Sequence, residues 1–414
     1  MLTPNRTQVE FRAVDLDGLL PADHLARLVW DFVVAQDLSE LYDGIRSVEG
    51  GPGHGATDPR ILLALWLYAT LDGVGSARAL DRLTEAHDAY RWLCGGVPMN
   101  YHTLSDFRVG HVALLDRLLT TNVASLMAAG VVTLDRVAQD GVRVRASAGA
   151  ASFRRRGTLE ECLREAEEHV QALKRELEED PAATSRRQQA ARLAAAEERK
   201  RRVSEALAQM ADAEAKKKPG ETEKARVSTT DPDARVMKMG DGGFRPAYNG
   251  QFAVDTESQV VVGVAVSNSG SDRGKMPPMV DQVAARYGET PDEYLVDGGF
   301  AKHEDIETVT ASGCTVYAPV QKSRSDARDP HEARPGDSAV IASWRARMAT
   351  AGAKEIYKER AATAECVNAL ARNRGLQQFA VRGTDKVLAI LLWYALAHNL
   401  MRALHLLAVA ASQA

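Results

Sequence analysis

Three acidic side chains stand far apart in the sequence at positions from which they can meet. Asp140 lies within a β-branched, partly alternating run, and Asp297 ends a short apolar run and precedes two glycines. Glu365 lies in a segment of helical character. If the two runs form neighbouring strands of a sheet and the helix packs across them, the three carboxylates converge.

Such a trio suits magnesium, which prefers hard oxygen ligands and keeps several of its waters. Two ions about 3.5–4 Å apart can hold the attacking and the leaving oxygens of a phosphodiester. One ion lowers the pKa of the attacking water or 3′-hydroxyl, and the other stabilises the departing oxyanion. The sequence contains no other motif of comparable content, since it has no Walker A run, no GxGxxG after a strand, no HExxH and no GxSxG.

The spacing of these acids by itself leaves a structural explanation open. The chain has 56 acidic residues, so some fall at strand ends by chance. An aspartate before two glycines is often only a turn former, and a glutamate on a helix usually faces solvent.

The elements that must position the acids follow from hydrophobic periodicity. Strand patterns lie within residues 131–146, 248–255, 259–266, 294–297 and 314–319. Helical patterns lie between and after them, at residues 277–287, 302–312 and 360–373 and from residue 384 onward. This order predicts an α/β fold, a mixed sheet flanked by helices, with the active site at strand ends.

Two further parts accompany this catalytic core, which we assign to residues 127–157 and 227–414. Residues 1–126 are predicted to form a domain of short helices, which either carries a DNA-binding helix-turn-helix or is only a packing bundle. Residues 158–226 have apolar residues spaced three and four apart on both sides of Asp180-Pro181. That pattern predicts an inserted antiparallel helical hairpin followed by a linker.

Composition limits where the protein can bind and reside. The formal net charge is −4 and the pI is about 6.2, so contact with nucleic acid depends on local basic patches. The four cysteines are widely spaced and the first residues lack the apolar stretch of a signal peptide, which favours a reducing cytosol. The apolar run at residues 387–411 contains His398, Asn399 and Arg402, so we expect a buried helix with a polar stripe and no membrane contact.

Three segments, VAQDGVRVRASAG, YLVDGGFAKHEDI and YKERAATAECVNALAR, resemble bacterial insertion-sequence transposases of the DDE type, which have a ribonuclease H-like catalytic domain. The last segment resembles the family's Tyr–Arg–Glu–Lys signature. Tyr357 is followed after two residues by Arg360, after four more by Glu365 and after six more by Arg372. The signature usually has three residues between its arginine and glutamate, and lysine at the last position. The segments DPRILLALWLYATLDGVGSARALDRL, YHTLSDFRVGH and KMGDGGFRPAYNGQFAVD also resemble parts of these transposases.

The resemblance implies a role for each matching residue. Asp140, Asp297 and Glu365 would hold two Mg²⁺ ions, for which Mn²⁺ can substitute. Tyr357 and Arg360 would contact DNA phosphates near the cleaved end, and Arg372 would touch the transposon end. Each of these three side chains also has a purely structural reading, as a packing or surface ion-pair residue.

Arg143 and Arg145 follow Asp140 on the same strand and are further candidates for holding DNA. The basic runs at residues 154–156, 199–202 and 216–218 either bind phosphates or form a solvated face, and for the hairpin we favour the solvated face.

The implied activity is metal-dependent hydrolysis at element ends followed by strand transfer to target DNA. Its partners would be the terminal inverted repeats and target DNA, bound by a homodimer in the synaptic complex, in the cytoplasm at the nucleoid. Two alternatives stay open: a non-catalytic DNA-binding regulator derived from a transposase, and another ribonuclease H-like nuclease.

Overall fold

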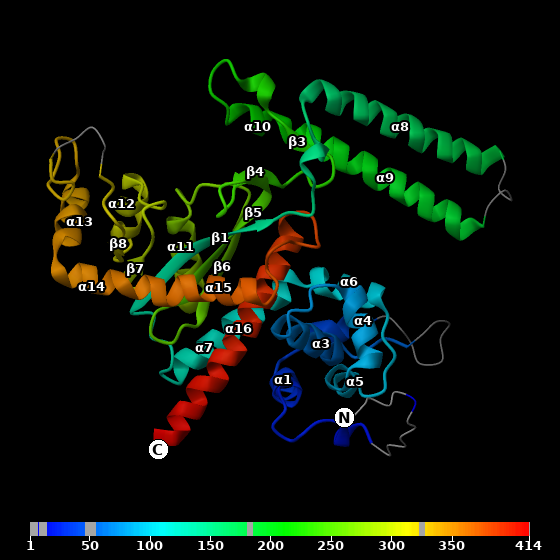
Figure 1. The fold of residues 1–414 in the computed structure, drawn as a ribbon, viewed down its shortest axis with the longest axis horizontal. Coiled ribbons are helices and arrows are strands. Elements are labelled where there is room, and N and C mark those ends of the chain that lie inside the picture. Colours follow the sequence, from blue (N-terminus) through cyan, green and yellow to red (C-terminus); the bar gives the residue numbers. More distant parts are fainter. Residues whose placement is uncertain (1–6, 8–14, 46–54, 180–184, 323–327, 414) are drawn as a thin grey trace, which may run out of the picture. The chain divides into compact units, whose positions relative to one another are not determined.

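The computed structural model describes residues 7, 15–45, 55–179, 185–322 and 328–413. The chain divides into two compact units, Met1–Arg108 and Val109–Ala414 (Figure 1). Each unit has its own buried core, and each is described separately below.

The first unit is a bundle of short helices arranged around one apolar helix. That helix, α3 (Pro59–Leu71), begins at Asp58, whose side chain accepts a hydrogen bond from the Arg60 amide, and it is buried over most of its length. The indole of Trp66 donates to the Leu104 carbonyl at 2.9 Å, which ties α3 to the end of the unit. The other helices are α1 (Leu25–Val34), α2 (Ser39–Asp43), α4 (Ala77–Ala86), α5 (Asp88–Cys94) and α6 (Tyr101–Gly110).

The second unit is built on a mixed sheet with the order β6–β5–β1–β7–β8, and β4 extends the β6 edge by pairing with the start of β5. β5 runs antiparallel to β1, whereas β7 and β8 run parallel to β1. This is the ribonuclease H-like mixed sheet that the sequence predicted, so the expected fold class is confirmed. The strands are β1 (Arg136–Arg145), β4 (Arg235–Lys238), β5 (Phe244–Asp255), β6 (Val261–Ser267), β7 (Glu293–Leu295) and β8 (Thr315–Tyr317).

Helices cover both faces of this sheet. On one face, Gly250 of β5 lies against Leu391 of α16 (Thr384–Gln413), and on the other, Gly263 of β6 lies against Met279 of α11 (Met276–Tyr287). Helix α7 (Val112–Ala128) packs on α16 and β6 and therefore belongs to this unit, although the sequence-based division grouped residues up to 126 with the N-terminal helices. The remaining helices are α12 (His303–Ala311), α13 (Ala339–Ala349), α14 (Ala351–Arg360) and α15 (Cys366–Asn373).

Helix α16 is long and apolar enough to cross a membrane by length and composition, but 67% of its apolar window is buried in the protein. Its polar stripe has structural partners. Asn399 both accepts from the amide and donates to the carbonyl of Val261, each at 2.8 Å, and His398 Nε2 lies 2.8 Å from the Gln259 carbonyl. A helix whose polar groups bind the start of β6 in this way is a core helix.

A helical hairpin is inserted between β1 and β4 and projects from the sheet (Figure 1). It consists of α8 (Arg156–Glu179) and α9 (Arg186–Ala208), followed by α10 (Met210–Ala215). At its base β2 (Phe153–Arg154) pairs with β3 (Val227–Ser228), a small ribbon that the sequence did not predict. The two long helices are joined by the ion pairs Lys174–Glu197, Arg192–Glu176, Arg199–Glu165 and Lys200–Glu167. Across these pairs, the residue number in α8 falls from 176 to 167 as the number in α9 rises from 192 to 200, so the two helices are antiparallel. The hairpin therefore has a solvated face on which the charges are paired.

Candidate active site

Two of the predicted acids lie side by side because of the strand register. β1 and β7 are parallel, with Val137 opposite Tyr294 and Ala138 opposite Leu295. Continued by two residues, this register brings Asp297 level with Asp140 on the neighbouring strand, and adjacent strands are about 4.8 Å apart. The pKa of Asp140 is raised mainly by burial and, to a smaller extent, by the negative charge of Asp297.

Asp140 is largely enclosed, with 20% of its side chain exposed. Its Oδ1 accepts from the Gly141 amide at 2.9 Å, and its Oδ2 accepts from Asn368 Nδ2 at 3.0 Å. Burial raises the pKa of this carboxyl above its ordinary value, while the nearby Arg360 guanidinium and the two hydrogen bonds oppose that rise.

Arg360 connects the third predicted acid to the first. Its Nη2 donates to Glu365 Oε1 at 2.7 Å, and its Nη1 lies 3.7 Å from Asp140 Oδ1. The guanidinium is thus placed between two of the three carboxylates. Its side chain is 12% exposed, whereas that of Glu365 is 53% exposed.

A π-helical turn makes the contact between Arg360 and Glu365 possible. In a regular α-helix, residues five apart are about 140° apart around the axis and residues four apart about 40°. Residues 361–365 form the π-helix η4 (Ala361–Glu365), in which hydrogen bonds span five residues. The additional residue in the signature is therefore absorbed by one wide turn, and Glu365 stays on the side of the helix that carries Arg360.

Helix α14 holds Arg360 in place through its neighbours. Arg136 at the start of β1 donates to Glu293 of β7 at 2.6 Å and to Glu359 at 2.6 Å. Tyr357 packs beside Arg360, whose guanidinium carbon lies 5.9 Å from the ring centroid. Burial raises the pKa of Tyr357, so its hydroxyl stays protonated and can donate a hydrogen bond.

The other predicted basic residues lie around this centre in different environments. Arg143 donates to the carbonyls of Lys238 and Gly270 at 3.0 and 2.8 Å, which fastens the loop after β6 to the tip of β4. Arg145, at the end of β1, and Arg372, on α15, are exposed. The structure brings Arg360 to Asp140 and Glu365 and leaves Arg372 about two helical turns beyond Glu365.

Two residues of the site gave no signal in the sequence. Asn368 lies three residues after Glu365, and asparagines on helices are common. Asp272 is in the polar loop between β6 and α11, and its Oδ1 accepts from Asn249 Nδ2 at 2.7 Å and from Gln251 Nε2 at 2.9 Å. A Cβ atom on Gly299 would lie 3.7 Å from Asp272 Oδ2 and 2.9 Å from Asp297 Oδ1, so both carboxylates border that glycine.

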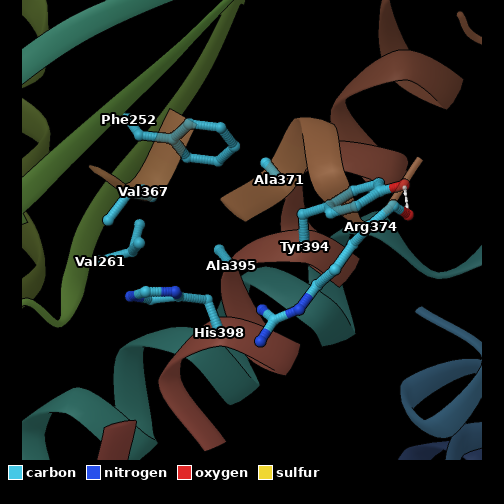
Figure 2. A pocket seen from close by; sticks show the side chains of 8 residues that line it. All are labelled: Phe252, Val261, Val367, Ala371, Arg374, Tyr394, Ala395 and His398. Atoms are coloured by element: carbon cyan, nitrogen blue, oxygen red, sulfur yellow. Dashed lines mark hydrogen bonds between the residues drawn. The ribbon is translucent and has the colours of Figure 1, made fainter. Parts of the chain in front are cut away.

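The cavity nearest to α15 is too small to receive a substrate. Figure 2 shows it enclosed by Phe252 and Val261 of the sheet, Val367 of α15, and Tyr394 and His398 of α16. Its volume is about 10 Å³, enough for one water molecule. Neither Asp140 nor Asp297 lines this cavity.

The donor set fits a hard divalent cation in chemical type. The three carboxylates are oxygen donors of the type that such a cation prefers, and the buried Oδ1 of Asn368 next to Asp140 has no hydrogen-bond partner. Within the described part of the chain, no three His, Cys, Asp or Glu side chains are close enough together to hold a metal ion. Arg360 occupies the place between Asp140 and Glu365, so a shared cation there requires its guanidinium to move.

Two known protein families match this chain. Residues 215–400 match the family described as "Transposase DDE domain", and residues 14–110 match the family described as "Transposase domain (DUF772)". The two matches are typical of insertion-sequence transposases, and the chain belongs to the DDE-type transposases. Asp297 and Glu365 fall within the first match, whereas Asp140 precedes it. The chain matches no curated protein and no solved structure.

Proposed function

We propose that this transposase cuts the ends of its element by metal-dependent hydrolysis and transfers the freed 3′-hydroxyl to target DNA at the same site. Asp140, Asp297 and Glu365 are the proposed ligands of two Mg²⁺ ions, which Mn²⁺ can replace. The observation that carries the proposal is the parallel register of β1 and β7, which, continued two residues past the end of β7, brings Asp297 level with Asp140. The Arg360–Glu365 pair lies against Asp140.

Divalent ions, when bound, would supply an activated oxygen nucleophile and stabilise the leaving oxygen. The chain's own residues have other tasks. Arg360, released from Asp140, would donate to a phosphate at the cleaved end, and the protonated hydroxyl of Tyr357 would donate beside it. Arg372, Arg143 and Arg145 would hold the DNA backbone farther from the cut.

The proposed partners are the terminal inverted repeats of the element and target DNA. Two ends must be held together while they are joined to the target, so we propose a homodimer in the synaptic complex. We place this activity in the cytoplasm at the nucleoid, where the DNA substrate is found.

The test is cleavage of DNA that carries the inverted repeats flanking the gene, in Mg²⁺ or Mn²⁺. Asp140→Ala, Asp297→Ala and Glu365→Ala should each abolish cleavage. Asp241→Ala, which removes an exposed carboxylate bonded to Arg245 and to the Gly243 amide, should leave cleavage unchanged. Comparable cleavage by the three site variants and the parent would refute the assignment.

A second candidate is a non-catalytic DNA-binding regulator derived from a transposase. It is favoured by the ion pairs of Arg360 with Asp140 and Glu365, which balance part of the negative charge of these two carboxylates without a metal. It is also favoured by the lack, among the described residues, of three His, Cys, Asp or Glu side chains close enough to hold a metal ion. A regulator would bind the inverted repeats, and the three alanine variants would bind them equally well, with no cleavage by any protein including the parent.

A further inference from the structure

We infer that Asn368 is a positioning residue of this site, which fixes the Asp140 carboxylate and presents a free carbonyl oxygen beside it. The inference rests on the proposed metal-dependent function. It assigns a role to a side chain that neither the acidic motif nor the Tyr–Arg–Glu signature includes.

The position of Asn368 on its helix connects Asp140, the first of the three acids in the sequence, with Glu365, the third. Residues three apart on a helix are neighbours on its surface, so Asn368 on α15 lies next to Glu365, the last residue of η4. Asn368 Nδ2 reaches Asp140 Oδ2 at 3.0 Å. One short segment therefore both carries the third acid and orients the first.

Hydrogen bonding to Asp140 is divided between its two oxygens. Oδ1 is held by the Gly141 amide at 2.9 Å, a contact within its own strand, whereas Oδ2 is held by Asn368 across to the helix. Without Asn368 the carboxylate could rotate about its side-chain bonds, and one oxygen would be left without a donor in an enclosed site. Such partners of metal ligands orient the ligand and are worth about 10–100-fold in metal affinity.

The second polar atom of Asn368 supports the same role. The residue is 3% exposed, and its Oδ1 has no hydrogen-bond partner. A buried carbonyl oxygen without a donor costs free energy, so an asparagine here is unfavourable for packing alone. A water bound to a neighbouring cation would satisfy it, since a magnesium ion keeps several of its waters.

Arg360 shows a parallel deficit on the other side of Asp140. Its Nη1 is buried and also lacks a hydrogen-bond partner, although it lies 3.7 Å from Asp140 Oδ1. An unused acceptor and an unused donor thus flank one carboxylate. The polar groups around Asp140 are complete only when a further polar or charged species is bound.

The experiment measures Mn²⁺ binding to the full chain by isothermal titration calorimetry, together with thermal unfolding of each protein. Asn368→Leu keeps the number and branching of the side-chain heavy atoms and removes both polar atoms. Asn373→Leu alters an exposed asparagine at the end of the same helix and serves as the control. We expect Asn368→Leu to weaken Mn²⁺ binding roughly tenfold in the folded protein, and Asn373→Leu to leave it unchanged. If Asn368→Leu does not fold, Asn368→Ala gives the same loss of the donor.

Unchanged Mn²⁺ affinity in a folded Asn368 variant would overturn the inference, even if the variant melts at a lower temperature, because a merely structural role changes stability and not affinity. Asp140→Asn separates this result from the proposed function. If the parent and Asp140→Asn bind Mn²⁺ equally, the proposed metal site itself is wrong. If Asp140→Asn loses binding and Asn368→Leu retains it, only the role of Asn368 fails.

Discussion

The π-helical turn between Arg360 and Glu365 makes a sharp prediction about the length of this helix. Ala361 and Ala362 are consecutive, exposed and part of the turn, so deletion of either gives the same sequence. The deletion converts the five-residue spacing into four, which on a regular α-helix differs from full alignment by about 40°. We expect the turn to become α-helical while Arg360 and Glu365 remain in reach of each other.

The matched control is deletion of Ala369, another exposed alanine, which lies in α15 seven positions after Ala362. No wide turn can absorb this loss, so the residues that follow rotate by about 100° and their Cα atoms move sideways by about 3.5 Å. Ala371 and Leu376, which are 6% and 2% exposed, then leave their buried positions. Loss of a buried leucine alone typically costs about 2–5 kcal/mol.

The assay is urea unfolding followed by circular dichroism, with cleavage of inverted-repeat DNA as the second measurement. The variant with the deletion in the π-turn should have a free energy of unfolding within about 1 kcal/mol of the parent's and should keep its activity. The variant that lacks Ala369 should be destabilised and inactive. The reasoning is refuted if both deletions are equally damaging, because the turn would then not be an absorbed extra residue.

Three further perturbations follow from single contacts. Arg136→Gln removes the charge that pairs with Glu293 of β7 and with Glu359. Because these side chains are about a quarter to a half exposed, we expect the free energy of unfolding in urea to fall by about 1–2 kcal/mol and cleavage to become slower. Gly141→Ala would place a Cβ 2.6 Å from the Asp272 carboxylate and lower thermal stability by about 1–3 kcal/mol, whereas Gly149→Ala, with open space around it, should not. Burial lowers the pKa of His398 to about 4 from its ordinary 6.5, so the unfolded chain binds a proton first as the pH falls and stability decreases between those values. Between pH 7 and pH 5, the free energy of unfolding of the parent should fall by about 2 kcal/mol more than that of His398→Gln. An equal pH dependence of the two proteins would contradict this expectation.

The sheet was predictable because strands are recognisable in a sequence by alternating apolar and polar residues and by β-branched side chains. The runs around Asp140 and before Asp297 were identified as strands, and a parallel pairing of the two strands then leaves few positions for the acids. The short ribbon of β2 and β3 was missed, since two-residue strands carry no periodicity. The inserted hairpin was predictable from apolar spacing, and its paired charges explain why its basic residues look like patches in the sequence without being isolated cations.

The helical half of the site was less predictable, because the direction of a side chain depends on helix phase. The spacing of four residues left the direction of Arg360 undetermined, and only the π-turn fixes it next to Asp140. Asn368 and Asp272 were missed for a related reason. Their importance depends on neighbours that are 228 and 21 to 23 positions away, and neither residue type signals such a contact.

The two halves of the site therefore differ in rigidity. Asp140 lies within β1 of the central sheet, and Asp297, two residues past the end of β7, accepts from the Gly299 amide at 2.7 Å in the turn that follows. Glu365 and Arg360 instead depend on a wide helical turn, which is held at Glu359 by Arg136 and at Asn368 by Asp140. A cation shared by Asp140 and Glu365 would compete with Arg360 for the same oxygens. Binding must then move the guanidinium away from Asp140, and the π-turn is the segment that can alter its shape without disturbing the sheet. The positive charge displaced in this way would remain at the edge of the site, where it could pair with a phosphate of the proposed DNA substrate.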